Sequence, residues 1–458
     1  MREQGGNNMT RRAHSHARTL VRSGLIALLV ALTLIARGTV ASPAHAQTVD
    51  VVIDHAINEF PRGVSFELGF TAAQPAKEVR VRYHLAPDGT GASAIATCND
   101  ATTTHTCRYT LTSGAGIFII PGAEITFGWD VTGADGTKTT VGDKLYVHED
   151  TRFTFARLDS GVAGAPGNIT LYYHSGGETQ ARAVLNAAAE TIAKVGALEK
   201  TEVTFPVKVF LYTTADEMQP AIAPGGQGRG VQVLGEVVYS DTAMVSADVA
   251  TLDIVRHEVA HIVTRQATKG PFDIAAWLNE GISVFTQTKP LTGQESSLQN
   301  AINSDRVLSI KELNSSATGS VGATVGLYYG QAGSIVKFLV DTYGPDKFAE
   351  LLKTFKDGST ADKAFQSVYN FDQLGLENAW RASVGLKPRP PSASSTPVDT
   401  QEARAAATSA AKPTPAAANA ASGSSGGVSA VTITIIAVLA VLLLVTIGGA
   451  ATVIRRRM

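Results

Sequence analysis

The stretch "IVRHEVAHIV" (Ile254–Val263) carries two histidines four residues apart, with a glutamate directly after the first. It lies in a segment that we predict to be helical, Asp248–Thr268. Positions i and i+4 of a helix lie on one face, so His257 and His261 can present imidazoles to a single ion, and zinc binds neutral imidazole well. Glu258 lies about 100° further round the axis, where it can reach a water bound to the metal. A helix with three incidental polar residues is the alternative.

A third ligand is available in the next predicted helix, Asp273–Thr286. A catalytic zinc needs three protein ligands and an open fourth position. The run "AAWLNEGISVF" supplies Glu280, with 18 residues between it and His261. Two antiparallel helices joined by a short loop can direct all three side chains inward. Coordination would also offset the cost of burying a carboxylate among apolar residues.

This pattern resembles that of a known family. H-E-x-x-H, followed after 18 residues by the glutamate of W-L-N-E-G, is similar to the motif of gluzincin metallopeptidases, in particular the peptidase MA-like domain of extracellular bacterial proteins. The resemblance covers roughly residues 151–386, including "YYGQAGSIVKFLVDTYGPDKF"; the domain ending in "YVHEDTRFTF" is similar to a module often attached. It implies a zinc metallopeptidase, a hydrolase with one Zn²⁺ per chain bound by His257, His261 and Glu280. Glu258 would be the general base on a zinc-activated water.

The sequence leaves the roles of further residues near the site open. Families of this kind often add a tyrosine or histidine as an oxyanion donor, and the resemblance makes Tyr329 the catalytic candidate, at the start of a predicted helix Gln331–Thr342. Tyr328 is its neighbouring alternative, and packing is an alternative for both. Asp253 could orient the first histidine or be a solvated helix-start carboxylate. Asn279 could help to place the third ligand or cap a turn.

One departure concerns substrate recognition. Aminopeptidases with this spacing carry an upstream G-x-M-E-N segment whose glutamate holds the free amine of the substrate. The corresponding region here, "VQVLGEVVYS" (Val231–Ser240), lacks that motif, and Glu236 stands in a different setting. We therefore predict hydrolysis of a peptide or protein substrate without predicting an aminopeptidase; the strand itself could pair with an extended peptide. The alternatives are a catalytically inactive binding or adhesion protein and a zinc hydrolase of a non-peptide amide.

Residues 47–150 indicate an all-β domain. Apolar residues alternate in "VSFELGF", "VRVRYHL" and "ITFGWDV", and turn signals such as Asp135-Gly136 separate these runs. About a hundred residues of such strands favour a β-sandwich of immunoglobulin or fibronectin type III architecture. The two cysteines, Cys98 and Cys107, indicate a disulfide in an exported chain. A zinc site that includes His105 is the alternative.

Residues 151–386 have a mixed pattern. Strand-like runs at Asn168–His174, Phe205–Tyr212 and Val231–Ser240 precede a series of helical segments, which favours an α+β domain. The glycine-rich loop at 225–230 is not a strand-to-helix phosphate motif. The formal net charge of -1 offers no basic field for nucleic acid.

The two ends predict an exported, anchored protein. Residues 1–46 combine arginines, an apolar run and Ala44-His45-Ala46, which is typical of a signal peptide; an uncleaved anchor is the alternative. Residues 387–427, rich in Ala, Pro, Ser and Thr, predict a disordered linker. Residues 428–454 carry no charge and exceed the ~20 that a transmembrane helix needs. Three arginines in the tail, 455–458, place it in the cytoplasm, so the catalytic part of this single-pass cell-membrane protein is expected outside. The sequence does not determine the oligomeric state.

Overall fold

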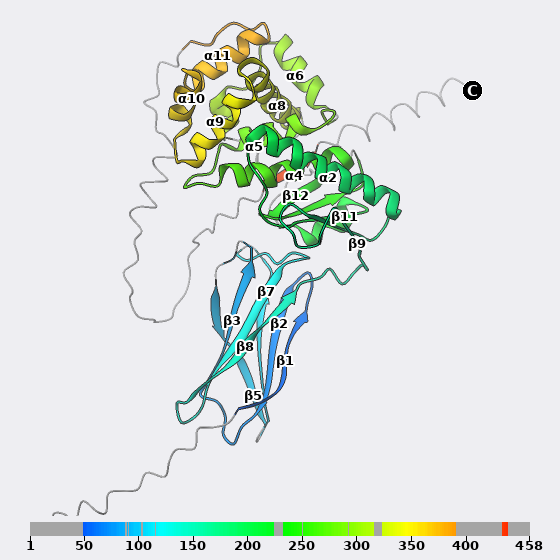
Figure 1. The fold of residues 1–458 in the computed structure, drawn as a ribbon, viewed down its shortest axis with the longest axis vertical. Helices are drawn as coiled ribbons and strands as arrows, with labels where there is room; N and C mark the ends of the chain where they lie inside the picture. Colours follow the sequence, from blue (N-terminus) through cyan, green and yellow to red (C-terminus); the bar gives the residue numbers. More distant parts are fainter. Residues whose placement is uncertain are drawn as a thin grey trace, which may run out of the picture.

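The computed structural model describes residues 49–390, apart from positions 88, 90, 102–103, 115, 224–231, 250, 292 and 316–322, together with residues 433–437. Three parts follow one another along this described chain (Figure 1). A β-sandwich comes first, a mixed sheet covered by helices lies next to it, and a helical lobe lies at the far end. The predicted order, an all-β region followed by an α+β domain, is confirmed.

The sandwich consists of two antiparallel sheets, with strand orders β1-β2-β6-β5 and β4-β3-β7-β8. The apolar residues of the predicted alternating runs fill the interior of the sandwich. Among them, Val64, Phe66, Leu68 and Trp129 are completely buried. The strands are β1 Asp50–Asn58, β2 Gly63–Thr71, β3 Glu78–Ala86, β4 Ala92–Ile95, β5 Thr97–Ala101, β6 Thr104–Thr112, β7 Glu124–Thr132 and β8 Lys138–Val147.

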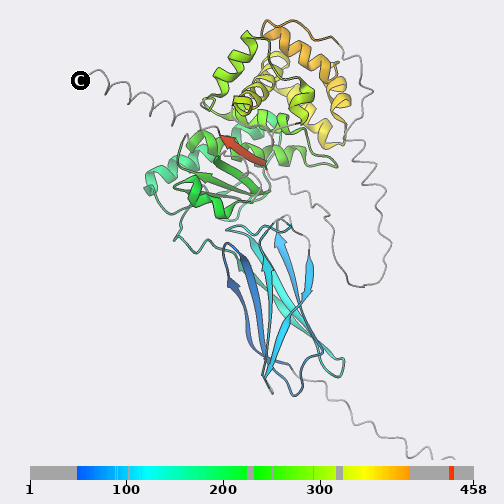
Figure 2. The ribbon, with the colours of Figure 1, turned by 180° about the vertical axis from the view of Figure 1, so that it is seen from behind.

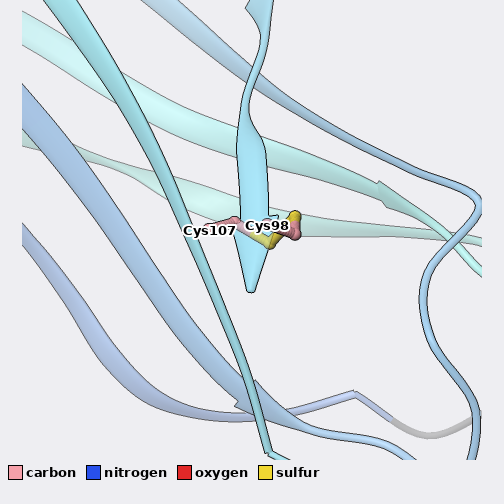
Figure 3. Close-up of a disulfide and its surroundings, with 2 residues drawn as sticks. All are labelled: Cys98 and Cys107. Carbon is pink, nitrogen blue, oxygen red and sulfur yellow. A yellow bond between two sulfur atoms is a disulfide. The ribbon is translucent and has the colours of Figure 1, made fainter. Parts of the chain in front are cut away.

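The predicted disulfide is present. Cys98 on β5 lies directly opposite Cys107 on β6 in the antiparallel ladder, with a Cα–Cα distance of 4.0 Å. Figure 3 shows the sulfur atoms joined between the two strands. The bond therefore links an edge strand to its neighbour within one sheet.

The α+β domain is built on a sheet with the order β14-β12-β13-β11-β10-β9. Strands β10, β11 and β13 are parallel, whereas β9 and β12 run antiparallel to their neighbours. The strands are β9 Ala156–Asp159, β10 Ile169–Tyr173, β11 Val207–Tyr212, β12 Gln232–Tyr239, β13 Thr242–Ser246 and β14 Ile433–Ala437. Helices α2 (Gly177–Glu199) and α4 (Thr251–Thr268) bury one face of the sheet, while a short helix α3 (Ala215–Met218) and a 3-10 turn η1 (Gln219–Ala221) follow β11.

The opposite face of this sheet packs on the sandwich. Phe210, Tyr212 and Met244 belong to the same buried cluster as the sandwich core. The Tyr212 hydroxyl donates to Asp150 Oδ2 at 3.1 Å, and Lys208 Nζ donates to the Gly122 carbonyl at 3.0 Å. A continuous apolar core with polar contacts at its rim therefore joins the two domains.

The helical lobe surrounds a third apolar cluster, which contains the buried Trp277 and Trp380. Its helices are α5 Ala276–Thr286, α6 Gln294–Asn303, α7 Ile310–Ser315, α8 Ala323–Tyr343, α9 Pro345–Lys356, α10 Ala361–Tyr369 and α11 Gln373–Ser383. The segment predicted as a helix from Gln331 begins earlier, at Ala323. Tyr328 and Tyr329 therefore lie inside α8, not at its start.

The terminal predictions fall largely outside the described residues. These are the signal peptide, nearly all of the linker, the cytoplasmic tail and most of the transmembrane helix. Within residues 428–454, the described part is strand β14, which pairs antiparallel with β12 (Figure 2). The helix prediction is wrong for these five residues, because β-branched isoleucine and threonine favour pairing with an open strand edge. Among the described residues, no helix combines the length and apolarity that crossing a membrane requires.

Candidate metal centre

Two packed helices bring the predicted ligands together. His257 and His261 lie one turn apart on α4, with ring centroids 4.8 Å apart, and both are buried. Helix α5 packs against α4 and carries Glu280, which is also buried. The helical repeat aligns the imidazoles, and the packing of α5 supplies the carboxylate.

The ligand atoms converge on one point. Glu280 Oε2 lies 3.1 Å from His257 Nε2 and 3.5 Å from His261 Nε2. One ligand atom from each of the three residues lies within 4.8 Å of the others. Bonds of about 2.05 Å to a tetrahedral zinc would place its ligand atoms about 3.4 Å apart. Both nitrogen–oxygen separations therefore fit such an ion, with both imidazoles turned to the carboxylate through Nε2.

The charges of the donor set also fit zinc. Burial lowers the pKa of His257 to about 4, so this imidazole is neutral at pH 7. Burial raises the pKa of Glu280, but the neighbouring His261 and His257 outweigh it and bring the pKa to about 2. His257 thus offers a neutral nitrogen and Glu280 an ionised carboxylate, a combination that zinc accepts.

Glu258 lies beside this triad and against the sheet. It is completely buried on α4, and burial, followed by the charges of Glu280 and Glu236, raises its pKa well above the ordinary value. A Cβ added to Gly235 on β12 would lie 2.6 Å from Glu258 Oε1. The glycine therefore lets the carboxylate approach the strand closely. A divalent cation in the triad would favour the ionised form of Glu258.

Glu236 lies on the same strand, β12, and is itself completely buried. Burial raises its pKa to about 8. The sequence did not reveal this burial, because a single glutamate in a strand is usually exposed.

The far side of each imidazole meets neutral polar groups. His261 Nδ1 lies 3.0 Å from Ser283 Oγ and 3.1 Å from Asn279 Oδ1. His257 Nδ1 lies 3.3 Å from Gln287 Nε2. Asn279 thus contacts an imidazole, a role that the sequence left open. Sequence reasoning missed the serine and the glutamine. Ser283 lies three residues after Glu280 on α5, and Gln287 directly follows the last residue of that helix; this spacing was the available signal.

Asp253 does not contact the first histidine. Its Oδ1 accepts from the Thr288 backbone N–H at 2.7 Å, and Arg256 Nη1 lies 3.2 Å away. Of the two roles that the sequence left open for Asp253, orientation of His257 is not the one that these contacts give it. Asp253 ties the start of α4 to the segment that follows α5, because the two helices lie side by side.

Both candidate tyrosines lie near the triad. The ring of Tyr329 is 6.1 Å from that of His257, measured between centroids. The Tyr328 hydroxyl is buried without a hydrogen-bond partner among the described residues. Burial, followed by the charge of Glu280, raises the pKa of Tyr328. The Tyr328 phenol therefore stays protonated and able to donate.

Residues 187–385 match the family model of the Peptidase MA superfamily. A search of curated proteins found no match. Among solved structures, the chain is similar to an M1 zinc metallopeptidase from Deinococcus radiodurans, with a TM-score of 0.38, 10% identity and coverage of 76% of this chain and 96% of that chain. It is also similar to an aminopeptidase N family protein from Idiomarina loihiensis, with a TM-score of 0.28, 10% identity and coverage of 74% and 71%. The family match includes the whole triad and Glu258.

Proposed function

We propose that this protein is a zinc-dependent peptidase whose metal ligands are His257, His261 and Glu280. The convergence of two Nε2 atoms and one carboxylate oxygen within 4.8 Å carries this proposal. The Peptidase MA superfamily match over the same segment supports peptide bonds as the substrate class. When bound, Zn²⁺ polarises a peptide carbonyl and lowers the pKa of water.

The remaining chemistry belongs to the side chains. Glu258 is the general base: it accepts a proton from the attacking water and returns it to the leaving amine. Its position one residue after His257 keeps it beside the ion without making it a ligand. Tyr329 donates a hydrogen bond to the oxyanion that forms from the scissile carbonyl, with Tyr328 as the second donor candidate.

The deciding experiment compares the full-length wild type with Glu258→Gln on a peptide library. Wild type should cleave peptides, lose this activity with a chelator and regain it with zinc. Glu258→Gln should bind zinc and cleave about 10²–10⁴ times more slowly. Glu178→Gln is the matched control, because this exposed residue on α2 lies outside the site. A peptidase whose rate survives Glu258→Gln, or a wild type that binds zinc without cleaving any peptide, would refute the proposal.

We also propose that the protein is exported and anchored in the cell membrane by residues 428–454, which requires that residues 433–437 leave their pairing with β12 when the segment enters the bilayer. The apolar runs near both ends and the terminal arginines support this location. An external protease added to intact cells should remove the catalytic domain and leave a membrane-associated C-terminal fragment. Full protection of the chain, or its recovery in the soluble fraction, would contradict this location.

A further inference from the structure

The contacts behind the two ligand histidines differ in kind. His261 Nδ1 meets the oxygen atoms of Ser283 and Asn279, whereas His257 Nδ1 meets the amide nitrogen of Gln287. The glutamine side chain is buried, and its Oε1 has no hydrogen-bond partner among the described residues. The partner of His257 is therefore a neutral amide that faces the ring with its donor end.

This contact matches one tautomer of His257. A donor from Gln287 requires a lone pair on Nδ1, which leaves the proton on Nε2. Nε2 then donates to Glu280 Oε2, 3.1 Å away. In this arrangement the lone pair that a metal needs is absent from Nε2.

A metal ion in the triad demands the other tautomer. Nε2 must then offer its lone pair, and the proton moves to Nδ1. Half a turn of the terminal torsion exchanges the oxygen and nitrogen of Gln287, so that Oε1 accepts from Nδ1–H. An ionised carboxylate in the place of this amide could stabilise only the metal-bound tautomer, in which Nδ1 carries the proton, because a carboxylate accepts hydrogen bonds and never donates them.

We propose that Gln287 is a positioning residue for His257. In the metal-free state its amide nitrogen donates to Nδ1 of His257, and in the metal-bound state its amide oxygen accepts from the Nδ1–H. The inference rests on the proposed function, because it assumes that the triad binds zinc. Asp253, the carboxylate that the sequence offered for this role, accepts hydrogen bonds from Thr288 instead.

The backbone of Gln287 is fixed well enough for this role. Its N–H donates to the Val284 carbonyl at 3.2 Å, which ends α5. The next residue, Thr288, gives both its backbone N–H and its hydroxyl to Asp253, at 2.7 Å and 2.9 Å. With the main chain held from both sides, the amide turns about its own torsions without displacing the ring.

Zinc dissociation constants test the inference in the full-length protein, by competition with a chromophoric chelator. Gln287→Leu keeps the approximate volume but cannot accept, so Kd should rise about 10–100-fold. Gln287→Glu provides a permanent acceptor, so Kd should equal the wild-type value or fall below it. Wild-type affinity in Gln287→Leu, or weakened binding in Gln287→Glu, would overturn the role.

A matched variant separates positioning from general loosening. Gln331 on α8 is a second buried glutamine, and its amide bonds the backbone N–H and carbonyl of Leu308, at 2.8 Å and 2.7 Å. Gln331→Leu should lower the melting temperature and leave Kd unchanged. If it raised Kd as much as Gln287→Leu, the specific role would be refuted. A wild type that fails to bind zinc would refute the proposed function itself, which distinguishes the two failures.

Discussion

Glu199 makes the stability of the protein depend on pH. Glu199 is the last residue of α2, and its side chain is buried. Thr264 Oγ1 on α4 donates a hydrogen bond to Glu199 Oε1 at 2.6 Å. Burial raises the pKa of Glu199 from 4.5 to about 8, against the lowering effect of this hydrogen bond. Because the folded pKa is raised, its contribution to stability is complete below pH 4.5 and is lost as the pH rises towards 8.

The size of the effect follows from linkage. Within this window the unfolded chain loses a proton that the folded protein keeps, and the difference costs about 1.4 kcal/mol per pH unit. Glu199→Gln keeps the shape and removes the titration. Relative to this variant, the wild type should lose about 3 kcal/mol of unfolding free energy between the lower end of the window and neutral pH.

Urea unfolding followed by circular dichroism, at several pH values between 4.5 and 8, measures this difference. The samples contain a chelator, because metal binding carries a pH dependence of its own. Glu202→Gln, a change at an exposed position three residues further on, should follow the wild type. Wild-type and Glu199→Gln curves that stay parallel across the window would refute the reasoning.

Other predictions follow from single contacts. Gly281→Ala places a Cβ 2.6 Å from the Ala332 carbonyl oxygen, where α5 crosses α8. In urea titrations this variant should lower the unfolding free energy by about 1–3 kcal/mol. An unchanged midpoint would contradict the close approach of the two helices. Tyr329→Phe should reduce kcat by about 10–100-fold with little change in KM, whereas Tyr328→Phe should reduce it less; the reverse order would identify the other phenol as the donor. Replacing both cysteines by serine should cost about 2–3 kcal/mol of unfolding free energy, and a loss below about 0.5 kcal/mol would show that the bridge adds little.

Local patterns predicted much of this molecule. The three period-2 runs placed strands β2, β3 and β7 of the sandwich, since alternate residues of a strand face the same side. The spacing of His257 and His261 aligned two ligands on one helical face, and Glu280 in the following helix completed the triad that the structure assembles. Helix boundaries were less predictable: α8 begins at Ala323, eight residues before the expected Gln331, because Gly326 and Gly330 weaken the helical signal of its first turns in the sequence.

The sequence by itself determined the all-β and α+β character of the two domains and the three side chains that converge on one point, because these follow from short repeats along the chain. Only the tertiary structure decided what stands behind those side chains. Gln287 meets His257, and Asp253 turns away to Thr288, because α4 and α5 pack side by side at one particular rotation. The burial of Glu236 and Glu199 is likewise a property of the assembled layers. Such contacts join residues distant in the chain, and no local period records the angle at which two helices meet.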